Sequence, residues 1–286
     1  MGAKRVSRLD RKFNDLTGSE WIRFTRSWFV CNPPRRKRDE IEHPAKFPEA
    51  VADSFIRFFT RAGESVLDPF SGVGSTVAAA CASDRTGVGL EINPDFLALA
   101  RARGDIPADA VLLQADARDA AARVREAGLD PVHLVFTSPP YWDMLRQSRG
   151  GVASVHKQRR ARGLRVAYSD NPADLGNIAS YDEFLLALRD IFAGFQTVLA
   201  PNRYLVIVVQ NVRTPEGVVR PLAWDLARLL SDVYDFKGER IWVQDNKPLG
   251  IWGYPTEFVT NVHHHYCLVF KNNPARRACD RGLGAV

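Results

Sequence analysis

The chain has 286 residues, of which 45% are hydrophobic and 25% are charged, and its formal net charge is +6. This length and apolar content are enough for one large core, or one core and a small lobe, as in an ordinary soluble globular protein. No run of about 18 apolar residues is present, and the basic first 12 residues lack the apolar stretch of a secretory signal, so we expect a cytoplasmic protein without a membrane span.

Short apolar runs that end in turn or acidic residues recur along the chain and alternate with helical patterns. The first half predicts strands at residues 64–68, 87–91, 110–116 and 132–138, with helices at 75–83, 95–103 and 117–127. The second half predicts helices at 181–199 and 222–233, with strands at 203–211, 238–244 and 265–271. This pattern indicates an α/β fold, a doubly wound and mainly parallel sheet of about seven strands with an antiparallel edge strand.

One stretch interrupts the repetition. Between Asp143 and Asp170 there is no acidic residue, yet seven Lys or Arg residues occur. We therefore predict four segments: a basic N-terminal extension (1–40), a catalytic domain (41–142 and 181–272), an inserted basic lobe for target recognition (143–180) and a C-terminal tail (273–286).

Polar residues close successive predicted strands. Asp68, Glu91 and Asp116 close the first three strands, and Ser138 closes the fourth. Ligands of open α/β sheets bind beyond the carboxyl ends of the strands, so we expect these side chains to line one site. The turn after the first strand, residues 68–76, is rich in glycine and opens a helix, so its backbone can approach a ligand closely.

The acidic residues favour one class of ligand over others. Asp68 suits the cationic methionine part of S-adenosylmethionine and would repel a pyrophosphate. Glu91 is placed to accept hydrogen bonds from ribose hydroxyls, and Asp116 from an adenine amino group. No Gly-Lys-Ser/Thr follows the glycines, which disfavours a nucleotide hydrolase. The alternative is that the acids only cap helices, and it is most serious for Asp116, because a predicted helix begins at the next residue.

The run Ser138-Pro139-Pro140-Tyr141 follows the fourth strand. Two prolines stiffen the backbone and remove two amide donors, which leaves carbonyl groups as hydrogen-bond acceptors. Acceptors on the hydrogens of an exocyclic amine favour the pyramidal nitrogen that can attack a methyl group. Tyr141 would stack on a base flipped out of the duplex. The alternative is a rigid turn whose aromatic residues cover the core.

Several motifs in residues 41–272 together resemble the DNA methyltransferases that modify exocyclic amino groups. They are residues 42–48, 68–76, 89–93, 138–141 and 241–270. The Thr-Ser-Pro-Pro-Tyr form of the fourth motif is most similar to the N4-cytosine branch. The resemblance implies a Rossmann-like methyltransferase fold and S-adenosyl-L-methionine as the cofactor.

The resemblance also implies the site residues. The catalytic residues would be Ser138, Pro139, Pro140 and Tyr141. The cofactor would be bound by His43, Lys46, Phe47, Asp68, Pro69, Phe70, Gly72, Gly74, Ser75, Thr76, Glu91, Ile92, Asp116 and Ala117.

The cations that follow the fourth motif predict contact with nucleic-acid phosphates. The residues expected to bind nucleic acid are Trp142, Arg146, Arg149, Lys157, Arg159, Arg160, Arg162 and Arg165. A solvated charged loop is the alternative, but a base flipped beside Tyr141 would leave the duplex here. Neighbouring residues of a strand point to opposite faces, so the run His263-His264-His265 offers at most two ligands, and we expect no metal site.

The sequence thus predicts a site-specific methyltransferase that acts on N4 of a flipped cytosine in double-stranded DNA by direct in-line transfer. None of its four cysteines, Cys31, Cys81, Cys267 and Cys279, lies in a motif suited to attack a pyrimidine ring, and none forms a C-x-x-C pair. Three alternatives stay open: amino methylation of adenine or RNA, an inactive nucleic-acid-binding module, and a nicotinamide-dependent oxidoreductase. The resemblance implies a prokaryotic, nucleoid-associated enzyme, either solitary or with a cognate restriction endonuclease.

Overall fold

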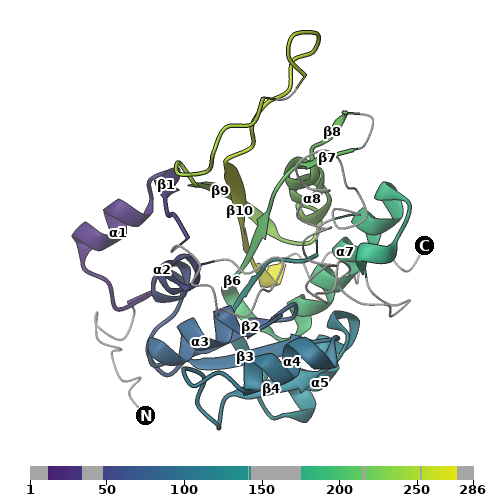
Figure 1. Cartoon of the computed structure of the whole chain (residues 1–286). Helices are drawn as coiled ribbons and strands as arrows, with labels where there is room; N and C mark the ends of the chain where they lie inside the picture. Colours follow the sequence, from purple (N-terminus) through teal and green to yellow (C-terminus); the bar gives the residue numbers. More distant parts are fainter. Residues whose placement is uncertain are drawn as a thin grey trace, which may run out of the picture.

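The computed structural model of the chain describes residues 12–33, 48–140, 142, 175–214, 217–251 and 253–275. One large sheet of eight strands forms its centre, in the order β1-β9-β10-β6-β5-β2-β3-β4 (Figure 1). Its strands are β1 (Trp28–Val30), β2 (Ser65–Asp68), β3 (Thr86–Glu91), β4 (Val111–Gln114), β5 (Val132–Thr137), β6 (Leu199–Val209), β9 (Asp235–Val243) and β10 (His264–Lys271).

The sheet is mainly parallel, which confirms the predicted α/β class. Only β10 runs antiparallel to its neighbours β6 and β9. Two details differ from the prediction: β10 lies inside the sheet and not at its edge, and β1 adds an eighth strand parallel to β9. The true edges are therefore β1 and β4.

Helices cover both faces of this sheet (Figure 1). They are α1 (Gly18–Phe24), α2 (Glu49–Phe59), α3 (Ser75–Ala82), α4 (Pro94–Arg101), α5 (Ala120–Glu126), α7 (Tyr181–Gly194) and α8 (Leu222–Leu230). Short 3-10 turns lie at Ala117–Asp119, Leu175–Asn177 and Phe195–Thr197, and a small hairpin joins β7 (Val212–Arg213) to β8 (Val219–Arg220). The core contacts place α2 and α3 on one face and α5, α7 and α8 on the other.

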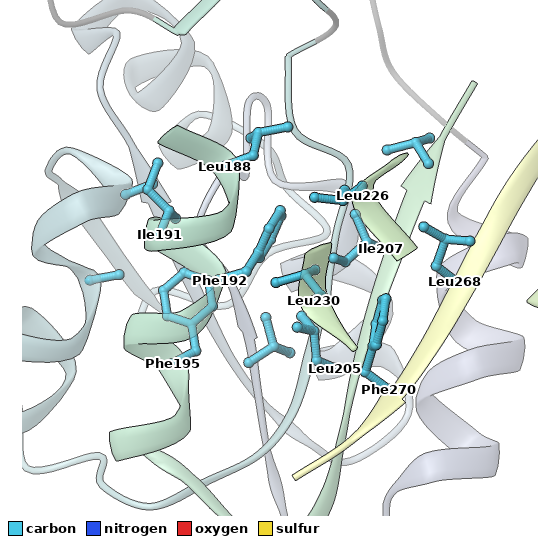
Figure 2. Close-up of a cluster of buried hydrophobic side chains, with 14 of the residues drawn as sticks. Leu188, Ile191, Phe192, Phe195, Leu205, Ile207, Leu226, Leu230, Leu268 and Phe270 are labelled. Carbon is cyan, nitrogen blue, oxygen red and sulfur yellow. The ribbon is translucent and has the colours of Figure 1, made fainter. Parts of the chain in front are cut away.

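The central strands are apolar on both faces because both faces are covered. In β6, Leu205, Ile207 and Val209 belong to the core under α7 and α8, whereas Val206 and Val208 belong to the core under α2. Figure 2 shows the first of these cores, with side chains of α7 and α8 packed on those of β6 and β10. Such burial on both sides produces the continuous apolar runs that predicted parallel strands.

Part of the segment predicted as a basic extension is folded onto the sheet. β1 pairs with β9 through Trp28 and Ile241. The guanidinium of Arg240, on β9, lies 3.9 Å from the ring centroid of Phe24 and 4.5 Å from that of Phe29. Cation–π contact and the packing of the partly buried Phe24 and Phe29 on the core thus attach α1 and β1 to the fold. Neither element was predicted from the sequence, and α2 was also not predicted.

Most of the connection between β9 and β10 forms a long arm that projects from the sheet (Figure 1), within residues 245–262, of which the structure describes 245–251 and 253–262. It corresponds to the predicted loop at 245–261. The β7–β8 hairpin lies beside the base of the arm, where a guanidinium nitrogen of Arg213 donates to the carbonyl of Thr260 at 3.1 Å.

Candidate cofactor and active site

The candidate site lies where β2, β3 and β5 end. β2 lies between β3 and β5 and is parallel to both, so their carboxyl ends meet at one edge. Asp68 is the last residue of β2, Glu91 is the last residue of β3, and Ser138 follows β5 directly. The structure therefore brings these three predicted residues together at the point where strand order reverses, which is where such sheets bind ligands.

Asp68 links the glycine-rich loop to the turn after β5. One carboxylate oxygen accepts from the hydroxyl of Thr137 at 2.6 Å and from the amide of Phe70 at 3.0 Å. The other accepts from the hydroxyl of Thr76, at the start of α3, at 2.5 Å. Asp68 is only 1% exposed, and three groups of the chain itself already bind its carboxylate. Its geometry is that of a positioning residue.

Burial raises the pKa of Asp68 to about 6, and the hydrogen bonds from Thr137, Thr76 and Phe70 oppose that rise. Removal from water destabilises the charged form, whereas donors stabilise it. The balance leaves the carboxylate ionised at neutral pH, so it can accept from both threonine hydroxyls.

The loop between Asp68 and α3 needs glycine at two positions. Gly72 and Gly74 have φ angles of 53° and 80°, in the left-handed region that side chains disfavour. A Cβ on Gly74 would also lie 2.6 Å from Cδ1 of Ile106. These constraints explain the glycine spacing that the sequence analysis singled out.

Glu91 fixes the same loop from the neighbouring strand. Its carboxylate accepts from the amide of Gly72 at 2.9 Å and from the amide of Asn93 at 2.8 Å. Both amides belong to the chain itself, so one role of this carboxylate is to hold the loop in place. The predicted ribose contact stays a prediction.

Two hydroxyl groups in the loop are buried without a hydrogen-bond partner among the described residues. They are the Oγ atoms of Ser71 and Ser75, in residues that are 6% and 5% exposed. Buried polar groups are rarely left unpaired in folded proteins. Ser75 was predicted to bind the cofactor, and Ser71 was missed although it lies inside the same motif. A polar ligand in this loop would supply the missing partners.

The other cofactor-binding residues predicted in this region are buried or partly buried. Pro69 and Thr76 are buried, and Phe70 and Ile92 are partly buried. The ring of Phe70 meets that of Phe192 edge to face, with centroids 6.3 Å apart. Phe70 therefore also packs the loop against α7.

Asp116 caps the short turn after β4, as the alternative interpretation anticipated. Its carboxylate accepts from the amide of Arg118 at 2.9 Å and pairs with the guanidinium of the same residue at 2.7 Å. The next residue, Ala117, is buried. The predicted adenine contact of Asp116 stays a prediction.

The turn after β5 begins at a buried hydroxyl. Thr137, whose hydroxyl binds Asp68, is fully buried. Ser138 and Pro140 are partly exposed, and Pro139 is buried between them. Thr137 was not among the predicted site residues. The signal that could have predicted its role is a hydroxyl at the end of β5, because the neighbouring strand β2 ends in the carboxylate of Asp68.

Trp142 corrects one predicted contact. This residue was expected to bind nucleic acid, but it is 9% exposed and its indole donates to the carbonyl of Ile178 at 3.1 Å. Its ring also meets Tyr181 edge to face, with centroids 5.2 Å apart. Trp142 therefore belongs to the core beside α7, because its polar and apolar parts both have partners there.

Other predicted residues lie outside the described part of the chain. They are Tyr141 of the catalytic motif, the cofactor-binding His43, Lys46 and Phe47, and the nucleic-acid-binding Arg146, Arg149, Lys157, Arg159, Arg160, Arg162 and Arg165.

The histidine run lies at the start of β10. In the described ranges, no group of three or more His, Cys, Asp or Glu residues is placed to hold a metal ion. His265 stacks on Trp242 with ring centroids 4.5 Å apart, and burial lowers its pKa to about 3.

Among the described residues, no helix is long and apolar enough to cross a membrane.

A model of the N6/N4 DNA methylase family matches residues 5–102, which include β2, the glycine-rich loop and β3. The predicted resemblance to the DNA amino-methyltransferases is confirmed. This match also supports S-adenosylmethionine as the cofactor. It ends before the Ser138-Pro139-Pro140-Tyr141 motif, so it bears on the cofactor half of the site.

Named DNA methyltransferases match the chain over short stretches. The Type II methyltransferase M.BglI from Bacillus subtilis is 35% identical over 88 residues, which are 30% of this chain and 24% of that protein. The DNA adenine methyltransferase YhdJ from Escherichia coli (strain K12) is 41% identical over 69 residues, 24% of each chain. The match thus spans about a quarter of the length of these methyltransferases.

One solved structure is the TTHA0409 protein from Thermus thermophilus in complex with S-adenosyl-L-methionine. It is 26% identical to this chain, has a TM-score of 0.36, and the match covers 56% of this chain and 54% of that one. A TM-score at this level does not establish a shared fold. The fold assignment therefore rests on the strand order and direction described above.

Proposed function

We propose that this chain transfers a methyl group from S-adenosylmethionine to an exocyclic amino group in DNA, and that the acceptor is N4 of a cytosine flipped out of the duplex. The observation that carries the proposal is the bridge through Asp68. The carboxylate holds Thr76 of the glycine-rich loop and Thr137 of the turn that precedes Ser138. One buried group thus joins the loop proposed to bind the cofactor to the turn proposed to bind the amine.

The residues of the loop fit the proposed cofactor. Ser71 and Ser75 offer buried hydroxyls that have no hydrogen-bond partner among the described residues, and the carboxylate of Glu91, which is proposed to bind the ribose, lies at the end of β3 beside the same loop. Bound S-adenosylmethionine would supply the methyl group on a sulfonium. The chain would bind and orient this molecule at the carboxyl edge of the sheet.

In the proposed transfer, Ser138 and the Pro139 carbonyl accept hydrogen bonds from the target amine, and Tyr141 stacks on its ring. The amine nitrogen held by these acceptors would take the methyl group directly from bound S-adenosylmethionine, whose sulfur would leave as a neutral thioether, and the proton lost by the nitrogen would pass to solvent. Catalysis by the protein is positioning and electrostatic stabilisation. No covalent enzyme intermediate is needed.

The described cysteines support this direct route. Cys267 is buried, and burial raises the pKa of its thiol to about 12, far from that of a reactive thiolate. Burial also raises the pKa of Cys31 and Cys81. Attack of a thiolate on a pyrimidine ring, as in C5-cytosine methylation, is therefore not favoured here.

N6 of adenine is the second candidate acceptor, because one relative is named as a DNA adenine methyltransferase. Digestion of methylated DNA to nucleosides, followed by mass spectrometry, separates the two candidates. We expect N4-methyldeoxycytidine. N6-methyldeoxyadenosine would overturn the cytosine assignment and retain the amino-methyltransferase.

We further propose that residues 143–180 form an inserted lobe for target recognition and that its cations contact DNA phosphates. Neutralising Arg159, Arg160 and Arg162 together should reduce the slope of log affinity against log salt by about 3, since each phosphate contact contributes about 0.9. An unchanged slope would mean that this segment is a solvated charged loop that does not contact DNA. A cognate restriction endonuclease stays a predicted partner, which protection of host DNA from cleavage would test.

A further inference from the structure

The arm formed by residues 245–262 exposes apolar side chains to an unusual degree. Leu249, Ile251, Tyr254 and Phe258 are 76%, 86%, 81% and 90% exposed, the four highest values among the exposed large hydrophobic residues of the described chain. Single exposed apolar residues are ordinary, but a concentrated set marks an interaction surface. The arm therefore has a surface that suits a partner.

The arm has a defined shape. The amide side chain of Asn261 spans it, donating to the carbonyl of Gly250 at 3.0 Å and accepting from its amide at 2.9 Å. At the tip, the carbonyl of Gly253 accepts from the amides of Thr256 and Glu257 at 2.8 Å and 2.7 Å. The two sides of the arm are thus joined by hydrogen bonds, while the four apolar side chains stay exposed.

The position of the arm relates it to the candidate active site. β10 begins where the arm ends, β6 lies between β10 and β5, and the register aligns Leu268 with Ile207 and Ile207 with Thr137. Neighbouring strands are about 4.8 Å apart, so the strand that supports the arm is about 10 Å from β5. Because β10 is antiparallel, the arm and the turn at Ser138 leave the same edge of the sheet.

Basic residues stand at the base of the arm. Lys247 is partly buried there, and Arg213 and Arg220 lie on the adjacent β7–β8 hairpin. The arm also contains two acids, Asp245 and Glu257, of which Asp245 accepts from the amide side chain of Asn32 at 2.7 Å. Duplex DNA has phosphates on the outside and stacked bases inside. Cations at the base of the arm suit the phosphates, and the apolar side chains farther along the arm suit the bases.

We propose that the arm inserts its apolar side chains into the base stack of duplex DNA beside the target base. This inference rests on the proposed function. Leu, Ile and Phe are residues that DNA-binding proteins insert between base steps, where they replace lost stacking. Extraction of a base requires such unstacking. The arm then stabilises the opened duplex while the turn at Ser138 binds the extruded amine.

The test compares the full chain with the variant Leu249→Ser/Ile251→Ser/Phe258→Ser, and uses Leu186→Ser as the control. Leu186 is 53% exposed on α7, away from the arm. Permanganate oxidation of unstacked thymines in bound plasmid DNA, mapped by sequencing, reports distortion without requiring methyl transfer. We expect distortion by the wild type and the control, and its loss in the arm variant.

Methyl transfer gives the second measurement. We expect kcat/KM for paired DNA to fall about 100-fold in the arm variant, as for an unstacking free energy of a few kcal/mol per step. Binding of S-adenosylmethionine, measured by calorimetry, should not change. On a duplex in which the target base is mispaired, the variant should recover most of its activity, since unpairing is then already achieved.

Each outcome separates the two proposals. Distortion that needs the arm, without methyl transfer by the wild type, would support the arm inference and overturn the proposed function. If the arm variant distorted DNA and methylated it as the wild type does, the arm inference alone would be overturned. The same conclusion would follow if the arm variant lost equal activity on paired and mispaired DNA. A dimeric wild type with a monomeric arm variant in sedimentation would instead assign the arm to a second copy of this chain.

Discussion

The glycine-rich loop (residues 68–76) and the arm (residues 245–262) place polar and apolar groups in opposite ways. The loop buries the carboxylate of Asp68 and the hydroxyls of Ser71 and Ser75. The arm exposes side chains such as Ile251 and Phe258, although burial of such residues normally stabilises a fold. The buried polar groups of the loop suit the small polar ligand proposed for it, and the exposed apolar groups of the arm suit the large partner proposed for it. Substitutions in the loop should accordingly destabilise the fold, whereas substitutions in the arm should not.

The largest expected effect is on the pH dependence of stability through Asp68. Its pKa is about 6 in the folded chain and near 3.8 for an unperturbed carboxyl, so the folded state binds more protons between these values. The free energy of unfolding therefore falls as pH rises from about 4 to about 6, by at most about 3 kcal/mol from this group.

Denaturant unfolding of the wild type and Asp68→Asn between pH 4 and 7.5 checks this. Because the other titrating groups are shared, the stability of the wild type relative to the variant should decline with rising pH and level off above about 7. A constant difference would mean that Asp68 is not buried as described.

The next effect concerns the shape of the loop. Gly74→Ala should reduce the free energy of unfolding by about 2–3 kcal/mol, because the residue has a left-handed φ and its Cβ would meet Ile106. Gly63 is a matched control, with a φ of 81° and no atom within 4 Å of an added Cβ. Gly63→Ala should cost about 1 kcal/mol. Equal losses in chemical denaturation would contradict the close packing at Gly74.

A smaller effect tests the bridge between the two halves of the site. Thr137→Val keeps the shape of the side chain but leaves Asp68 without one donor, which should cost about 2 kcal/mol of stability and reduce turnover. Thr197→Val is the control, since that exposed hydroxyl donates only to the carbonyl of Gly194. If Thr137→Val keeps wild-type turnover in a methyl-transfer assay, the bridge does not position the catalytic turn.

The smallest effect is expected in the arm. Ile251→Ser should change the free energy of unfolding by less than about 0.5 kcal/mol, because an exposed side chain loses little contact on substitution. Thermal unfolding of this variant beside Gly74→Ala makes the comparison direct. A loss as large as that in the loop would show that Ile251 is buried against the protein in solution.

The sequence predicted the parts of the fold that repeat a local pattern. Strands β2 to β5 are apolar runs followed by polar ends, and the acids at those ends pointed to the edge where the site lies. β1 has three residues and pairs Trp28 with Ile241, far away in the chain, so no local pattern could reveal it. The antiparallel β10 was predicted as a strand, but its place inside the sheet depends on long-range pairing.

The candidate site was predictable in its residue types and less so in its contacts. The bridge from Thr137 to Asp68 depends on the relative position of two parallel strands, which spacing along the chain does not give. Trp142 was assigned to nucleic acid because it follows the catalytic motif, yet the carbonyl of Ile178 and the ring of Tyr181 place it in the core. Tertiary partners decided each of these outcomes.

The central claim is that the edge formed by Asp68, Glu91 and Ser138 binds S-adenosylmethionine, and a calorimetric titration tests it most directly. The wild type should bind S-adenosylmethionine and not NAD, and Glu91→Gln should weaken that binding at least tenfold, by the loss of a charged acceptor worth about 1.5–3 kcal/mol. Binding of NAD in place of S-adenosylmethionine would contradict the account and identify a nicotinamide-dependent enzyme.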